Sequence, residues 1–180
     1  MGVITRALKV AWDELNKPAS YVKGDEFERF IRTSLFPNTD YDLLQKTHDY
    51  TTNKNDYIET SKEPDFKFRS RISRKVFFVE AKYRSRFYNE VLDWCKPYQL
   101  NRYQAIDIIT PVYIAIGVGG QAREPDQVFL IPMKDIKYKR LFRSFLKRYQ
   151  VSAAHCVTER ELLTISQKQH LLCCLSSMIM

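Results

Sequence analysis

The stretch VFFVEAKYRSRF, residues 76–87, starts as a strongly apolar run and ends in charged side chains. In a β-strand residues i and i+2 lie on the same face, so Glu80 and Lys82 share one side of the strand. Both faces begin with apolar residues, which predicts a strand that is covered on both sides. An ionised pair at the end of such a strand is costly unless partners, a metal ion or water meet it. The sequence therefore predicts that other groups gather around Glu80.

A neighbouring acid lies in the preceding β-rich run, PDFKFRSRI at 64–72, which is followed by KVFFVEAKY at 75–83. Two such runs with a short polar break between them predict a hairpin. The hairpin makes Asp65 a candidate neighbour of Glu80.

Three tripeptides in the chain have an acid and a lysine two positions apart. Average residue usage gives roughly one or two such matches by chance in a chain of this length. Context separates them, because only Glu80 and Lys82 end a strongly apolar strand with an acid on the strand before it. The three are Asp65-Phe66-Lys67, Glu80-Ala81-Lys82 and Asp135-Ile136-Lys137.

Two carboxylates that converge at a strand end make a site of hard oxygen ligands. Such a site suits Mg²⁺ or Mn²⁺, which bind one or two carboxylates together with waters and substrate phosphate oxygens. The ion would relieve the repulsion between Asp65 and Glu80, activate a water and neutralise charge that builds on a phosphodiester. Lys82, on the same face, is placed to orient that water or to stabilise the phosphorus centre. These residues predict metal-dependent hydrolysis of nucleic acid.

The order of these pieces resembles the PD-(D/E)XK nuclease superfamily, which has the restriction-endonuclease-like fold. PDF followed by VFFVEAKY resembles its core signature, and KGDEFERFI at 23–31 looks like its helical motif, with Glu28 as the acid and Glu26 as a second choice. QLNRY resembles the Gln-x-x-x-Tyr motif of the exonuclease-type branch and maps onto Gln99 and Tyr103. The long polar insertion before Asp65 departs from the family pattern.

The resemblance implies roles for individual residues. Glu28 assists at the site directly or through water, and Gln99 and Tyr103 bind substrate or brace the site. The implied catalytic residues are Asp65, Glu80, Lys82 and Glu28, and the implied metal ligands are Asp65, Glu80 and the backbone carbonyl of Ala81.

The charge of the chain favours a polyanionic partner. The formal net charge is +8 and the pI is about 9.3, which is typical of nucleic-acid binding and, less so, of an acidic membrane surface. Arg84 and Arg86 alternate with aromatic residues in KYRSRF, as backbone-contacting segments often do, so phosphate contact is predicted for both. We expect DNA binding that weakens with salt through counterion release.

The remaining pattern predicts an α/β fold with a mixed central sheet flanked by helices. Pro97 is expected to break a helical pattern into two pieces, and a long polar connection covers 48–63. The predicted elements are helices at 4–17 and 24–36, strands at 41–47, 64–72 and 75–83, a helical region at 89–109, strands at 111–120 and 126–133, and a basic helix at 139–149.

The length of 180 residues predicts a single nuclease-like domain over 1–180, with its core at about 23–131. The segment 151–180 has no assignment. The chain has no run of 18 apolar residues and no secretory signal pattern, so we expect a cytoplasmic protein that does not use the membrane. Nucleases that cut both strands often act as dimers, which makes a homodimer a possible arrangement.

Two other function classes remain open. One is a non-catalytic nucleic-acid-binding module on the same fold, in which the acidic site is vestigial. The other is a structural or partner-binding protein, which would require the basic charge to be diffuse. A metal cluster of His155, Cys156, His170 and Cys173 can also be drawn, although reduced thiols are the expected state.

Overall fold

The computed structural model describes residues 18–47 and 62–176. The helix predicted at 4–17 and most of the connection at 48–63 lie outside these ranges. The described elements are α2 Ala19–Phe30, the π-helix η1 Ile31–Leu35, β1 Tyr41–Lys46, β2 Phe66–Ser70, β3 Val76–Arg84, β4 Val91–Asp93, α3 Pro97–Asp107, β5 Val112–Val118, β6 Gln127–Pro132, the 3-10 helix η3 Met133–Asp135, β7 Arg140–Phe142, α4 Arg143–Leu146, the 3-10 helix η4 Lys147–Tyr149, β8 Gln150–Val151 and α5 Glu159–Ser176.

A six-stranded mixed sheet forms the centre of the fold, with the order β1-β2-β3-β5-β6-β8. The pair β3 and β5 is parallel and every other neighbouring pair is antiparallel. A parallel pair needs a long crossover, and here the crossover contains β4 and α3. The sheet confirms the predicted α/β class and the hairpin of β2 and β3.

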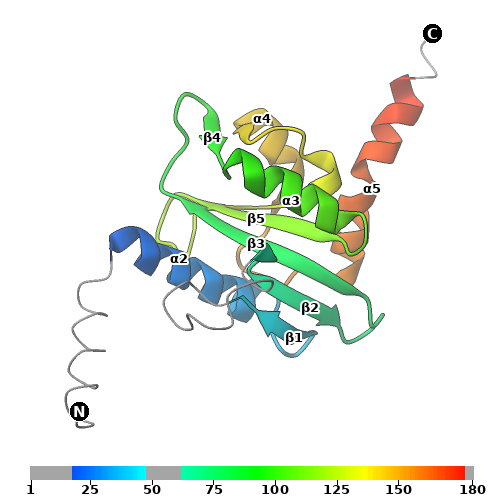
Figure 1. Ribbon diagram of the computed structural model, residues 1–180, viewed down its shortest axis with the longest axis horizontal. Coiled ribbons are helices and arrows are strands. Elements are labelled where there is room, and N and C mark those ends of the chain that lie inside the picture. The colour runs from blue at the N-terminus through cyan, green and yellow to red at the C-terminus, as the bar shows by residue number, and fades with distance from the viewer. Residues whose placement is uncertain (1–17, 48–61, 177–180) are drawn as a thin grey trace.

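Helices cover both faces of this sheet, as Figure 1 shows for α2 and α3. Every residue of β5 is buried, which fits a strand with side chains packed on both sides. On the α2 face, Phe27 packs so closely over Gly117 that a side chain at Gly117 would overlap the phenyl ring. The predicted helix near Gly24 is thus confirmed, and it starts earlier, after Pro18.

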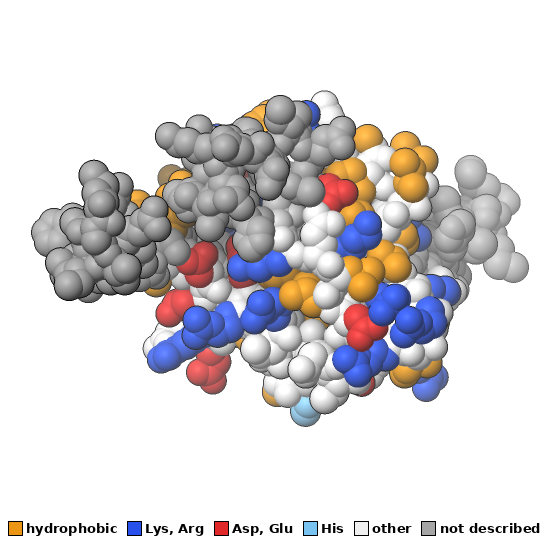
Figure 2. Space-filling view, turned by 60° about the horizontal axis from the view of Figure 1, so that its bottom comes forward, with side chains coloured by type: hydrophobic (Ala, Val, Ile, Leu, Met, Phe, Trp, Pro, Cys, Tyr) orange, Lys and Arg blue, Asp and Glu red, His pale blue; other side chains and the backbone are white. Residues whose placement is uncertain are grey.

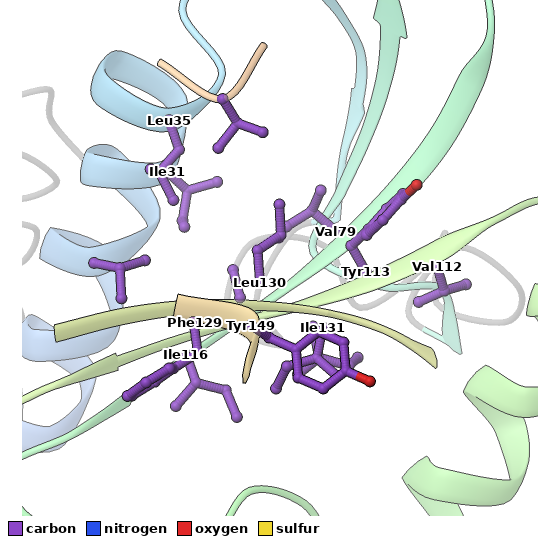
Figure 3. Packing of buried hydrophobic residues seen from close by; sticks show 14 of the residues in the cluster. Ile31, Leu35, Val79, Val112, Tyr113, Ile116, Phe129, Leu130, Ile131 and Tyr149 are labelled. Carbon is purple, nitrogen blue, oxygen red and sulfur yellow. The ribbon is translucent and has the colours of Figure 1, made fainter. Parts of the chain in front are cut away.

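The core lies in two layers separated by the sheet. Figure 3 shows Ile31 and Leu35 on the side toward which Val79 and Leu130 point, while Ile116 lies on the opposite side. Aromatic rings fill the first layer, with Phe36, Tyr41, Phe68 and Phe77 in mutual ring contacts. This packing holds the β2–β3 hairpin, and with it the charged end of β3, in a fixed place.

The predicted helical region at 89–109 is wrong in its first half. Pro97 begins a helix instead of interrupting one, because a proline at the first helical position gives up no hydrogen bond. The residues before it form β4, which pairs with β7 in a two-stranded sheet. This pairing is between segments far apart in the sequence, so local periodicity does not reveal it.

The basic helix predicted at 139–149 is also wrong. Arg140–Phe142 is extended because it pairs with β4, and only the four residues Arg143–Leu146 are α-helical before a 3-10 turn. Phe142, at the end of this extended segment, is 61% exposed. The long α5 had no prediction at all, and it adds Leu162 and Ile165 to the core.

No helix within 18–47 and 62–176 is long and apolar enough to cross a membrane.

Candidate active site

The hairpin brings Asp65 and Glu80 together. Phe66 of β2 pairs with Val79 of β3, so the residue before Phe66 lies opposite the residue after Val79. The backbone N–H of Asp65 donates to Glu80 Oε2 at 3.2 Å, and the N–H of Ala81 donates to Asp65 Oδ2 at 2.8 Å. Each carboxylate therefore accepts a hydrogen bond from the backbone of the opposite strand, which fixes both side chains at one point.

Lys82 completes this arrangement on the same face of β3. Its ammonium forms an ion pair with Glu80 Oε1. Only 2% of the Glu80 side chain is exposed, against 21% of the Lys82 side chain, so the lysine lies between its buried partner and solvent. The structure thus gathers Asp65, Glu80 and Lys82 as the sequence predicted.

The electrostatics of the group show how strongly the charges interact. Burial raises the pKa of Asp65 well above its usual range, and the negative charge of Glu80 raises it further while Lys82 opposes the rise. Burial acts to lower the pKa of Lys82, but the charges of Glu80 and Asp65 outweigh it and raise that pKa. With both carboxylates ionised, the site would carry one negative charge more than Lys82 balances.

Glu28 lies on α2 within electrostatic reach of this pair, since its charge contributes to the raised pKa of Asp65. Its carboxylate forms an ion pair with Lys46 of β1, with Nζ 2.8 Å from Oε2. Sequence reasoning placed Glu28 at the site but missed Lys46. The only available signal was its position at the end of a strand that pairs with β2.

Tyr103 reaches the site from α3 on the face that Glu80 occupies. Its side chain is 3% exposed, and a hydrogen bond with Glu80 contributes to its pKa. Burial raises that pKa far above its usual range, and the charges of Glu80 and Asp65 add to the effect. The ring stacks on Trp94, with centroids 6.4 Å apart, and Trp94 is a second residue that sequence reasoning missed.

Gln99, predicted to act beside Tyr103, instead caps its own helix. The backbone N–H of Lys96 donates to Gln99 Oε1 at 3.1 Å, which satisfies a group at the start of α3. Its role in binding substrate stays a prediction.

Arg84 and Arg86 follow the site along the chain and differ in environment. The guanidinium of Arg84 donates to the carbonyls of Tyr83, Asp93 and Trp94 at 2.8 to 3.0 Å, so it braces the backbone between β3 and β4. Arg86 is exposed after the end of β3. Phosphate contact stays a prediction for both residues.

The donor set fits a hard divalent cation. Asp65 and Glu80 offer two carboxylates, which is the number that Mg²⁺ takes when waters and phosphate oxygens complete its shell. In the described ranges no group of three or more His, Cys, Asp or Glu residues gathers to hold a metal, so a dedicated cage is not among them. Ala81 follows Glu80 in β3 and its N–H donates to Asp65, and the role of its carbonyl as a ligand stays a prediction.

The face that Figure 2 shows carries charges of both signs, with Lys and Arg side chains beside Asp and Glu side chains. One group joins Arg69, Arg71 and Arg74 to Asp42 at 2.7 to 3.7 Å. Positive charge exceeds negative charge in that group, in line with the net charge of the chain.

A solved structure shares this architecture. Hjc, a Holliday junction resolvase from the archaeal hyperthermophile Archaeoglobus fulgidus, is 12% identical, with a TM-score of 0.51, and the match covers 73% of this chain and 97% of Hjc. The chain has the restriction-endonuclease-like fold. No protein-family model matches the sequence, and no curated protein matches it. In this fold Asp65, directly before β2, lies beside Glu80 of β3. At 12% identity the likeness to Hjc is one of fold.

Proposed function

We propose that this chain is a metal-dependent nuclease that hydrolyses phosphodiester bonds of DNA. The observation that carries the proposal is the group of Asp65, Glu80 and Lys82, in which two carboxylates are fixed by backbone hydrogen bonds and a lysine stands beside them. The fold of a Holliday junction resolvase and the net charge of +8 support DNA as the substrate.

Asp65 and Glu80 would hold Mg²⁺ or Mn²⁺, with the carbonyl of Ala81 as a third candidate ligand. When bound, such an ion lowers the pKa of a water and neutralises charge on the scissile phosphate.

The chain's own residues have separate tasks in this proposal. Lys82 orients the attacking water and stabilises negative charge on the phosphate, because its raised pKa keeps the ammonium charged. Tyr103 holds Glu80 in its rotamer by a hydrogen bond from a buried, stacked ring. Glu28, held by Lys46, adds negative charge beside Asp65 and so favours a cation there.

Cleavage assays on several DNA forms, with Mg²⁺ or Mn²⁺ and with chelator, test the proposal. We expect cleavage by the natural protein that is lost in Glu80→Ala and in Lys82→Ala. Lys75→Ala is the matched control, because Lys75 precedes the same strand, is exposed and forms no ion pair with a described residue. Equal cleavage by all four proteins would refute the assigned roles.

A non-catalytic DNA-binding module is the second candidate function. It is favoured by the fact that Glu80 is already satisfied within the protein, by Lys82 at one oxygen and by Asp65 N–H at the other. DNA binding without cleavage under any metal, and unchanged by Glu80→Gln, would select it.

Sedimentation of the protein with and without DNA would test the homodimer that cutting both strands suggests.

A further inference from the structure

A hollow of about 590 Å³ lies beside the candidate site and is not used by the proposed chemistry. Its volume falls within the range of about 300–1,000 Å³ that ligand pockets have. It is lined by Leu100, Lys137, Tyr138, Lys139, Arg140 and Phe142. The two-stranded sheet of β4 and β7, the loop before β7 and α3 build this hollow, and β4, α3 and α4 lie together on one side of the central sheet (Figure 1).

Aromatic rings are displayed to solvent around the hollow. Tyr138 is 72% exposed and Phe142 is 61% exposed. Both are costly to expose, and the lining beside them includes the cationic Lys137, Lys139 and Arg140 together with the apolar Leu100. An aromatic face beside cations is the combination that stacks on an unpaired base and neutralises its phosphate.

The backbone under Tyr138 is fixed rather than loose. Trp94 Nε1 donates to the carbonyl of Tyr138 at 3.1 Å, and the Trp94 N–H donates to the carbonyl of Lys139 at 3.0 Å. Gln104 Nε2 donates to the carbonyl of Ile136 at 3.2 Å. Because Trp94 is fully buried, these hydrogen bonds hold the loop on a rigid support. The Tyr138 side chain is exposed on this loop.

The charges of the hollow favour an anionic partner. Lys137 and Lys139 are exposed and form no ion pair with any described residue. Arg140 forms an ion pair with Asp93 at 3.2 Å, and Asp93 is the acid that this surface contains. One acid against three cations leaves net positive charge around the exposed rings.

Trp94 and α3 contact both the hollow and the candidate site. Trp94 holds the loop of Tyr138 by hydrogen bonds, and its ring stacks on Tyr103, which is hydrogen-bonded to Glu80. The helix α3 contributes Leu100 to the hollow and Tyr103 to the site. The hollow and the candidate site are therefore connected through Trp94 and α3.

From this arrangement we infer that the hollow binds an unpaired stretch of DNA, with bases stacked on Tyr138 and Phe142 and phosphates on Lys137 and Lys139. The inference rests on the proposed function and refines it, because it selects substrates that carry a single-stranded segment beside the cleaved bond.

Binding assays without metal test this separately from cleavage. Fluorescence anisotropy would compare a labelled single-stranded oligonucleotide with a duplex of the same length. Tyr138→Ala and Phe142→Ala should each weaken single-strand binding by about 5- to 100-fold and change duplex binding by less than about twofold. Lys139→Ala should lower the slope of log affinity against log salt concentration by about 0.7. Ile72→Ala, which removes an apolar side chain that is 79% exposed at another turn, should leave binding unchanged.

Tyr138→Trp and Phe142→Trp keep an aromatic face and should retain single-strand affinity, which separates stacking from damage to the fold. Single-strand affinity that stays within twofold in both alanine variants, or an equal loss on duplex, would overturn the inference. Self-association of the natural protein that Phe142→Ala abolishes would identify the surface as an interface between copies and would overturn it too. Failure of the proposed function would give another result: single-strand binding would persist, but no metal ion would support cleavage.

Discussion

Two buried carboxylates of this protein, Glu80 and Asp135, begin the same kind of tripeptide and have different surroundings. They are 1% and 3% exposed, and each accepts a hydrogen bond from a buried tyrosine. Glu80 is bonded by Tyr103, and Asp135 Oδ2 accepts from the Tyr149 hydroxyl at 2.9 Å. Composition and burial therefore do not distinguish the two acids.

The difference comes from the element that carries each acid. Glu80 lies in a strand, where the residue two positions on shares its face, so Lys82 forms an ion pair with it. Asp135 ends a 3-10 helix, and its lysine, Lys137, is exposed without an ion pair to any described residue. Asp135 Oδ1 has no hydrogen-bond partner within the described part of the chain.

The way a second acid is held is the other difference. The backbone N–H of Asp65 donates to Glu80, whereas Asp107, the acid whose pKa the charge of Asp135 helps to raise, accepts a hydrogen bond from the N–H of Val112. The comparison shows what makes this tripeptide a candidate site. A strand must place its acid and its lysine on one face, and a segment distant in the sequence must add a second carboxylate.

The largest expected effect separates the two acids by activity. Glu80→Gln should lower the DNA cleavage rate by at least about 10²–10³-fold, because it removes a proposed metal ligand and the partner of Lys82. Asp135→Asn should change the rate by no more than about twofold, or about 0.4 kcal/mol on the barrier. Rates measured with saturating Mg²⁺ check this, and equal losses in the two variants would contradict the distinction.

Metal binding sharpens the same comparison through stability. At a free Mg²⁺ or Mn²⁺ concentration 100-fold above its Kd, the free energy of unfolding of the natural protein should rise by about 2.7 kcal/mol. Asp135→Asn should keep this gain, and Glu80→Gln should lose most of it. Thermal unfolding with metal and with chelator measures the gain, and an undiminished gain in Glu80→Gln would place the ion elsewhere.

The sequence was sufficient for the centre of the fold because its signals are local. The continuous apolar runs at 76–79 and 112–118 identify strands that are covered on both faces. Their order, with the acid in PDF, identifies the pair of Asp65 and Glu80. These inferences need no knowledge of what packs against the strands.

The sequence was insufficient where distant segments decide the conformation. The segment 139–149 has helical spacing of apolar residues, but Arg140–Phe142 within it pairs with β4, so the pairing overrides the local pattern. Lys46 and Trp94 become part of the site through tertiary contacts with Glu28 and Tyr103, which no spacing in the chain encodes.

The two tyrosines allow a smaller test. Tyr103→Phe and Tyr149→Phe each remove a hydrogen bond to a buried carboxylate, and each should lower the free energy of unfolding by about 1.5 kcal/mol. Only Tyr103→Phe should also slow cleavage, by about tenfold, because Glu80 loses the group that orients it. Urea unfolding and kinetics on the same samples compare them, and a normal rate in Tyr103→Phe would leave that residue a purely structural role.

The smallest effect concerns proton binding at Asp65 in the metal-free protein. Its pKa is raised above the ordinary value of 3.8 by burial and then by Glu80, so the folded state holds this proton more tightly than the unfolded state. The stabilising contribution is therefore complete below pH 3.8 and is lost as the pH rises through the raised pKa. Other carboxylates produce the opposite trend in acid, so the informative quantity is a difference between proteins.

Asp65→Asn should remove this loss, and its stability relative to the natural protein should increase as the pH rises from about 4 through the raised pKa of Asp65 in the presence of chelator. Asp135→Asn serves as the control for loss of a buried carboxylate outside the candidate site. Chemical unfolding across this range measures the difference, and saturating Mg²⁺ should reverse its sign, because the ion stabilises only the protein that retains both carboxylates. A difference that is flat with pH would mean that the charges of Asp65 and Glu80 do not repel each other in the folded protein, and the electrostatic reason for a cation at this site would disappear.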